Sequence, residues 1–175
     1  MKKITYCSNC VYPVNAVNLN FDENGVCTSC KTAQTFEEIS SDYWIERKAK
    51  FEKLINQYKK DNNPNYDCLI PVSGGKDSFY QAHVIAKEYG LKPLLMTYHG
   101  GNYLPEGDRN RDLMRNVFDA DHIVWGPSVE VLKKLNKITF KMMGDMNWQN
   151  HCGIQTAPIN LAVKFDIPLI IWGET

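Results

Sequence analysis

The sequence predicts an α/β protein in which a parallel, doubly wound sheet follows a small N-terminal metal ribbon. Short apolar runs alternate with amphipathic segments between Cys68 and Trp172, which is typical of strands connected by helices. Ahead of them stand two Cys-x2-Cys pairs that are 16 residues apart. We therefore expect a ribbon over residues 1–34, a linker helix over 35–63 and the sheet domain over 64–175.

The composition is that of a globular protein without a strongly charged surface. Hydrophobic residues make up 43% of the chain, and 20 basic residues balance 20 acidic ones. Such a chain is not drawn by its net charge to nucleic acid or to a membrane surface. It also lacks an apolar run of membrane-spanning length and a secretion signal. We expect a cytoplasmic location, no membrane contact and reduced cysteines.

The paired cysteines predict a structural zinc site. Four thiolates fill the tetrahedral coordination of Zn²⁺ and leave no open position for catalysis. The expected ligands are Cys7, Cys10, Cys27 and Cys30. Residues 17–21 alternate in polarity, and Asp22 to Gly25 predict a hairpin turn between the two pairs. A disulfide pair, a redox dithiol and an iron–sulfur cluster are the alternatives, which the compartment, the duplicated pair and the spacing respectively disfavour.

The linker helix and the sheet domain are predicted from the periodicity of hydrophobic residues and from the residues that interrupt it. Thr35 to Glu38 resemble a capping box, and an aromatic stripe on the following helix is expected to pack in a core; its members are Trp44, Phe51, Leu54, Ile55 and Tyr58. Strands are expected at 68–72, 93–98, 122–125 and 168–172, with helices at 77–89, 107–118, 129–143 and 158–165 and a loop over 144–153. Because the chain stops directly after a strand, we expect it to be the N-terminal part of a longer protein.

The most informative stretch is Ser73-Gly74-Gly75-Lys76-Asp77-Ser78 between the first strand and its helix. Adjacent glycines let backbone N–H groups converge on an anion, and the helix N-terminus adds partial positive charge. The stretch is not a Walker A loop, whose Gly-x4-Gly-Lys-[Ser/Thr] pattern is absent. A capped Gly-Gly turn is the alternative reading. The stretch instead looks like the PP-loop of the ATP pyrophosphatases, which cleave ATP between its α- and β-phosphates.

Several further positions are candidates for binding or are assigned to solvent. In a sheet of this class ligands bind outside the carboxyl ends of the strands, which places Met96 and Tyr98 where they can frame adenine. Asp77 and Glu174 are candidate Mg²⁺ ligands, with solvated acids as the alternative. Two basic sets are expected to be solvated faces: Arg109, Arg111 and Arg115 on one helix, and Lys133, Lys137 and Lys141 on the next.

The order of these parts resembles the N-acetyl sugar amidotransferases of surface-polysaccharide (lipopolysaccharide) and flagellin-glycan biosynthesis. The resemblance rests on residues 7–13, 21–30, 73–78, 144–145, 151–154 and 167–174. It implies that residues Ser73 to Ser78, with Met96, Tyr98 and Gly153, bind ATP, that Lys76 and Asp77 act in catalysis, and that Mg²⁺ takes part. ATP would adenylate an acidic or N-acetylated sugar or nucleotide sugar, and ammonia from a partner glutaminase would displace AMP.

Two other functions remain open from the sequence. A PP-loop tRNA thiolase would use a cysteine near the site, for which Cys152 is available, although the neutral charge disfavours tRNA as a partner. The non-enzymatic alternative is a zinc-ribbon interaction module on a sheet domain that has lost its catalytic activity. Binding of ATP would distinguish this module from both enzymes. The acceptor substrate would distinguish the amidotransferase from the thiolase.

Overall fold

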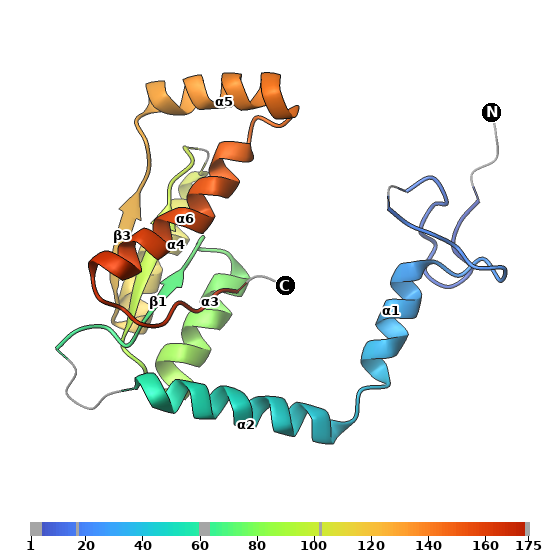
Figure 1. Ribbon diagram of the computed structural model, residues 1–175, viewed down its shortest axis with the longest axis horizontal. Helices are drawn as coiled ribbons and strands as arrows, with labels where there is room; N and C mark the ends of the chain where they lie inside the picture. The colour runs from blue at the N-terminus through green and yellow to red at the C-terminus, as the bar shows by residue number, and fades with distance from the viewer. Residues whose placement is uncertain (1–4, 17, 60–63, 102, 174–175) are drawn as a thin grey trace. The chain divides into compact units, whose positions relative to one another are not determined.

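The structure is a computed structural model that describes residues 5–16, 18–59, 64–101 and 103–173. It divides into two compact units, Met1–Lys53 and Leu54–Thr175. Figure 1 labels the helices and strands along the chain. The first unit contains α1 (Thr28–Glu37) and most of α2 (Ser41–Tyr58), and the second contains the sheet and the remaining helices.

The cysteine-bearing segment is held by turns and isolated bridges. Asp22 Oδ1 accepts hydrogen bonds from the amides of Asn24 (3.0 Å) and Val26 (2.9 Å), and Gly25 has a φ of 75°. Phe21 then pairs with Cys27 in an antiparallel bridge. The hairpin turn expected at Asp22 to Gly25 is confirmed, whereas Val17 lies outside the described residues.

The expectation of a single helix from Thr35 onward is wrong, because two helices occupy this region. Thr35 lies inside α1, where its hydroxyl donates to the Thr32 carbonyl, so it caps nothing. Ser40 Oγ instead accepts from the Tyr43 amide at 3.3 Å and caps the start of α2. Of the aromatic stripe on α2, Ile55 alone is fully buried among the described residues, while Trp44 is 51% exposed. The stripe is therefore not a continuous core face.

A parallel sheet organises the second unit. Its strands are β1 (Cys68–Pro71), β2 (Pro93–Tyr98) and β3 (Asp121–Trp125), in the order β1-β2-β3. All six residues of β2 are buried, as expected for a central strand of mostly apolar residues. The strand expected at 168–172 is reduced to one parallel bridge between Leu69 and Ile170. The ladder stops because Pro71, whose position would donate next to the Ile171 carbonyl, has no N–H, and Gln81 Nε2 donates to that carbonyl instead at 2.5 Å.

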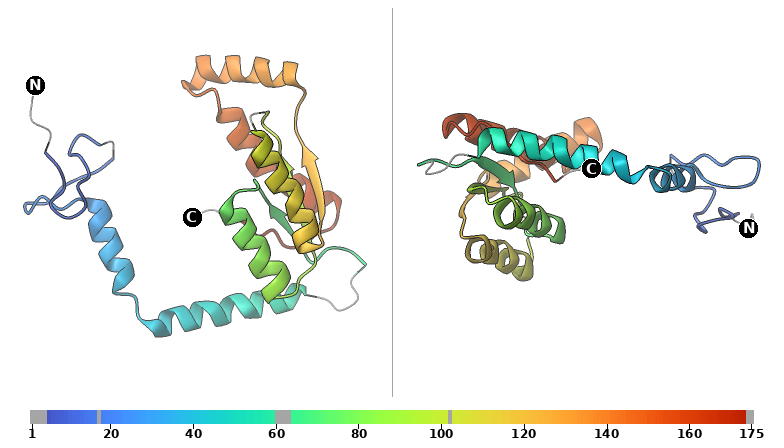
Figure 2. Two further views of the ribbon diagram at one scale, coloured as in Figure 1. Left: turned by 180° about the vertical axis from the view of Figure 1, so that it is seen from behind. Right: turned by 90° about the horizontal axis from the view of Figure 1, so that it is seen from below.

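Helices lie on both faces of this sheet, as the right-hand view of Figure 2 shows. On one face α6 (Trp148–Lys164) packs Ala162 into a core with Leu94 and Met96. Side chains alternate along a strand, so Thr97 faces the opposite side. That side is covered by α3 (Lys76–His83) and α4 (Pro105–Phe118), whose Phe79 and Phe118 rings lie 5.8 Å apart.

Of the four helices expected in this unit, α4 begins two residues early at Pro105, two others differ more, and one agrees. The helix expected at 77–89 is α3 followed by a π-helical turn, η1 (Val84–Glu88), before Gly90 with its φ of 65°. The loop expected over 144–153 ends early, because α6 begins at Trp148 and carries Pro158 in its interior. The expected range of α5 (Val129–Met143) is confirmed, and Gly144 ends it at a φ of 70°. Over the described part of the chain, no helix combines the length and apolarity needed to cross a bilayer.

Candidate functional site

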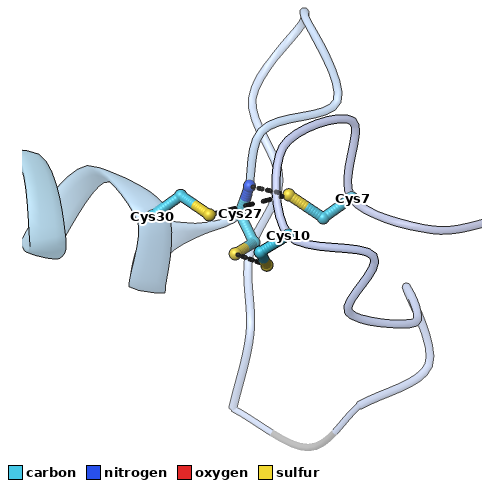
Figure 3. A group of neighbouring side chains, drawn as sticks. All are labelled: Cys7, Cys10, Cys27 and Cys30. Carbon is cyan, nitrogen blue, oxygen red and sulfur yellow. Dashed lines mark hydrogen bonds between the residues drawn. The ribbon is translucent and has the colours of Figure 1, made fainter.

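The four knuckle cysteines form a cluster that can hold a metal ion. Figure 3 shows their side chains converging from the two knuckles, with Cys30 contributed by the first turn of α1. All four sulfurs lie within 4.8 Å of one another, and two pairs are separated by 3.6 Å and 3.9 Å. A tetrahedral zinc–thiolate site with Zn–S bonds of ~2.3 Å has S···S edges of about 3.8 Å. The donor set and its dimensions are consistent with a structural zinc ion.

The surroundings of Cys7 favour a thiolate. Backbone amides of Asn9 and Cys27 donate to Cys7 Sγ at 3.4 Å and 3.3 Å. Burial raises the pKa of Cys7, but backbone hydrogen bonds, led by that from Cys10, outweigh it and bring the pKa to about 6. The neighbouring Cys10 side chain raises the pKa of Cys30 to about 12. A divalent cation removes this conflict, because it lets all four sulfurs be deprotonated together.

The glycine-rich loop lies at the carboxyl end of β1, where it leads into α3. The amide of Val72 donates to the Met96 carbonyl at 2.8 Å, which anchors the strand end to β2. Gly74 then turns the chain with a φ of 82°, and Gly75 is the N-cap of α3. A Cβ on Gly74 would lie 3.0 Å from the backbone nitrogen of Arg111. Glycine is thus needed at position 74 both for its conformation and for the close approach of α4.

The loop has both occupied and unoccupied donors. Ser78 Oγ accepts from the Ser73 amide at 2.9 Å and lies 3.1 Å from Ser73 Oγ, and the Gly75 amide donates to Ser73 Oγ at 3.3 Å. Both expected phosphate-binding hydroxyls therefore brace the loop internally. Within the described residues, four main-chain amides have no acceptor, those of Gly74, Lys76, Asp77 and Ser78. These amides start a helix, so they are available to an anion.

The side chains of Lys76 and Asp77 are exposed to solvent at the start of α3. Lys76 Nζ lies 2.6 Å from Asp77 Oδ1, and the two side chains are 88% and 78% exposed. An exposed pair of this kind contributes little to stability and exchanges readily. Lys76 can therefore leave Asp77 for a phosphate, and Asp77 can turn to a cation. Glu174, the other candidate Mg²⁺ ligand, lies outside the described residues.

The three remaining candidates for nucleotide contact lie at and behind the end of β2. Met96 is buried in the core beneath α6, and its carbonyl is the acceptor of the Val72 amide. Tyr98 packs directly on Gly153 of α6, where an added Cβ would collide with its ring. Its hydroxyl donates to Gln149 Oε1 at 3.2 Å, and burial raises its pKa. The structure brings Tyr98 and Gly153 together, and their contact with adenine stays a prediction.

Arg111, which is buried, and His122, which is half-buried, are polar residues whose surroundings the sequence analysis did not predict. The basic set on α4 was expected to be solvated, and this is wrong for Arg111, which is buried while Arg109 and Arg115 are exposed. A signal was present, because Arg111 precedes the buried Met114 and Phe118 by three and seven residues on one helix face. Lys133, Lys137 and Lys141 are exposed, as expected.

His122 is neutral and its tautomer follows from its partner. The hydroxyl of Thr97 donates to the Val72 carbonyl at 2.6 Å, so it accepts from His122 Nε2 at 2.9 Å. The proton is therefore on Nε2, and Nδ1 is an acceptor with no partner in the described part of the chain. Burial, reinforced by the charge of Arg111, lowers the pKa of His122 from 6.5 to about 4.

We expect His122 to make the protein less stable in mild acid. The unfolded chain binds a proton at this imidazole below pH 6.5, whereas the folded chain does so only near pH 4. The free energy of unfolding therefore falls as the pH drops through this window, and above it His122 has no effect. For the wild-type protein this loss of unfolding free energy amounts to on the order of 1–2 kcal/mol after solvent screening. In His122→Gln the loss should be absent. Urea unfolding at pH 7 and pH 4.5 measures it, and parallel pH profiles of the two proteins would contradict the assignment.

Comparisons with known proteins place the chain in no family. No protein-family model matches it. An uncharacterized protein of Methanocaldococcus jannaschii is 26% identical over 89 residues, which are 50% of this chain and 30% of that protein. This chain therefore spans less than a third of that relative. A solved structure described as a predicted subunit of a tRNA methyltransferase from Methanocaldococcus jannaschii has a TM-score of 0.42 and 23% identity, over 61% of this chain and 52% of that chain. The fold and the cluster define an α/β protein with a small parallel sheet and a four-cysteine cluster that can hold a metal ion.

Proposed function

We propose that the second unit is a doubly wound PP-loop domain whose loop 73–78 binds the β- and γ-phosphates of ATP. The observation that carries this proposal is the set of four amides without acceptors at Gly74, Lys76, Asp77 and Ser78. They lie at the carboxyl end of a parallel strand and at a helix N-terminus, and both features favour anion binding. Helices on both faces of the sheet support the doubly wound assignment.

The chemistry that fits such a loop is adenylation. An oxygen of the acceptor attacks the α-phosphorus of ATP, the bond to the β-phosphate oxygen breaks, and pyrophosphate leaves. The loop amides and Lys76 stabilise the negative charge on that leaving group, because they are oriented before the reaction starts. Asp77 is the candidate ligand for a Mg²⁺, which would supply further positive charge at the phosphates. AMP on the acceptor is then displaced by a nitrogen nucleophile.

The acceptor that we propose is an acidic or N-acetylated sugar or nucleotide sugar. The support is the resemblance of residues 7–13, 21–30 and 73–78 to the N-acetyl sugar amidotransferases. Ammonia from a partner glutaminase would attack the adenylated carbon and release AMP, which gives an amide or an acetamidino group. A role in surface-glycan biosynthesis and a cytoplasmic location belong to the same proposal, and the cysteine cluster would be a structural zinc ribbon.

One observation favours tRNA thiolation as a second candidate. The Cys152 thiol is exposed on α6, next to the Gly153 that packs on Tyr98 at the end of β2. In a thiolase such a cysteine could carry a persulfide supplied by a donor protein: its outer sulfur displaces AMP from the adenylated base, and a thiol reductant then cleaves the S–S bond and restores the cysteine. Cys152→Ser therefore separates the candidates, since it would abolish thiolation and leave amidation intact.

Pyrophosphate release by the full-length protein tests the proposal. The reactions contain ATP, Mg²⁺ and ammonium, with a panel of acidic and N-acetylated sugars in one series and bulk tRNA in the other. We expect release that depends on both a sugar and ammonium. Release that depends on tRNA and a persulfide sulfur donor would replace amidation by thiolation. No release with any acceptor, together with no binding of ATP, would overturn the enzymatic assignment.

A further inference from the structure

Arg111 is a buried cation in the middle of α4. Its side chain is 9% exposed, whereas that of Arg109 on the same helix is 75% exposed. A guanidinium stays charged at all working pH values and presents five N–H donors. Burial of such a group is costly unless its donors find acceptors. The contacts of Arg111 therefore decide whether its position is explained by the fold alone.

Those contacts leave much of the guanidinium unused. Arg111 Nη2 lies 2.8 Å from Asp108 Oδ1, without hydrogen-bond geometry at that oxygen, and Asp108 is itself half exposed. The guanidinium carbon lies 5.0 Å from the centre of the Tyr103 ring, which covers one face of the group. Arg111 Nε and Nη1 have no acceptor among the residues that the structure describes. Two buried donors of a permanent cation therefore lack a partner.

Arg111 also lies against the glycine-rich loop. The backbone nitrogen, Cα and Cβ of Arg111 lie 3.0 to 3.2 Å from the position of a Cβ on Gly74. Figure 2 shows α3, which the loop starts, beside α4. His122 is near enough for the charge of Arg111 to lower its pKa, and this imidazole is neutral, so the buried positive charge here belongs to Arg111. The backbone of Arg111 thus packs against Gly74 of the loop whose four amides lack acceptors, and its guanidinium extends to Tyr103 and Asp108 at the N-terminal end of α4.

On the basis of the proposed function, we propose that Arg111 is a second cationic anchor of the loop site. Its Nε and Nη1 donate to non-bridging oxygens of the pyrophosphate portion of the nucleotide. Lys76 and Arg111 have different roles, since Lys76 is a mobile point charge in solvent and Arg111 is a fixed fork held by burial. A planar fork matches two phosphate oxygens, and its charge strengthens both hydrogen bonds. The site therefore selects for the pyrophosphate group over the nucleoside.

Binding of inorganic pyrophosphate and of AMP to the full-length protein tests this role by titration calorimetry. Arg111→Gln keeps a polar side chain but removes the charge and the fork. We expect it to weaken pyrophosphate binding by about 10- to 100-fold, the range for charged hydrogen bonds, and to change AMP binding much less. Arg109→Gln is the matched control, because it removes an equal but exposed charge two residues away and should leave both affinities unchanged. Pyrophosphate affinity of folded Arg111→Gln equal to that of the wild type would overturn the inference.

The controls separate this inference from the proposed function. Wild-type protein that binds no pyrophosphate would overturn both, whereas wild-type protein that binds it with Arg111→Gln unaffected would overturn only the role of Arg111. If Arg111→Gln does not fold, the Arg Nε–H resonances of the wild-type protein provide the answer. Added pyrophosphate should shift the Arg111 resonance and leave that of Arg109 in place. An unmoved Arg111 resonance in a saturated sample would contradict the proposal.

Discussion

Replacing Cys27 with serine is expected to unfold the cysteine-bearing segment from Thr5 to Glu37. Within the described residues of the first unit, only Cys7 and Cys27 are fully buried, and α1 buries no residue. The described part of this unit therefore has no hydrophobic core that could fold it without metal. Structural zinc supplies on the order of 10 kcal/mol in such small elements, so the loss of one ligand removes most of the folding free energy.

Metal analysis and limited proteolysis check this expectation. The wild-type protein should carry one zinc per chain and resist cleavage before Glu37, whereas Cys27→Ser should lose both properties and keep an intact second unit. Cys152→Ser is the control, because Cys152 is exposed and lies outside the cluster. Equal zinc content and equal protease resistance in Cys27→Ser would show that the four sulfurs do not hold a structural metal.

Lys76→Ala is expected to slow pyrophosphate release by about 100- to 1000-fold, the cost of losing one preorganised donor to a developing charge. The folded structure should not suffer, because the ion pair of Lys76 with Asp77 is exposed on both sides. The free energy of unfolding should change by less than about 0.5 kcal/mol. Loss of rate without loss of stability is the signature of a group that acts on the leaving phosphates.

Lys87→Ala provides the comparison for this rate measurement. Lys87 is an exposed lysine in η1, at the opposite end of the helical segment that begins at Lys76. Its removal changes the net charge by the same amount without touching the loop. Steady-state pyrophosphate release with all substrates saturating should match the wild type for Lys87→Ala. A similar modest loss in both variants would mean that Lys76 acts only through the overall charge.

Much of the sheet domain could be predicted because its signals are local. The bounds of β2 agree with the expectation, since Leu94, Leu95 and Met96 form an apolar run between polar segments. Glycines at 90 and 144 end helical segments where expected, because their positive φ values suit few other residues. The carboxyl end of β1 and the start of α3 surround the glycine-rich loop as predicted.

The failures have tertiary causes. Pro158 was expected to start a helix, but it lies inside α6. Its side chain is fully buried there, and the helix tolerates the backbone hydrogen bond that proline cannot donate. The segment around Ile170 has strand composition, but its partner strand ends at Pro71, which has no N–H to donate to the Ile171 carbonyl. In both cases the deciding neighbour lies far away in the sequence.

In the candidate site, too, local features could be predicted from the sequence and tertiary contacts could not. Cysteine spacing predicted the four-sulfur cluster, because ligand geometry imposes a fixed short gap in each knuckle. The burial of Arg111 was missed because its arginine neighbours suggested a solvated face, although its spacing to Met114 indicated a buried one. The two hydrogen bonds that join Ser73 to the Ser78 hydroxyl depend on the turn geometry of the loop, and no sequence pattern indicates them.

The most direct test of the central claim is a titration of the isotope-labelled full-length protein with inorganic pyrophosphate and Mg²⁺, followed by amide NMR spectra. Binding by the loop predicts saturable shifts at the amides of Gly74, Lys76, Asp77 and Ser78, with little change at Gly25 or Gly144. Spectra in which these four amides stay fixed at millimolar pyrophosphate would contradict phosphate binding at this loop.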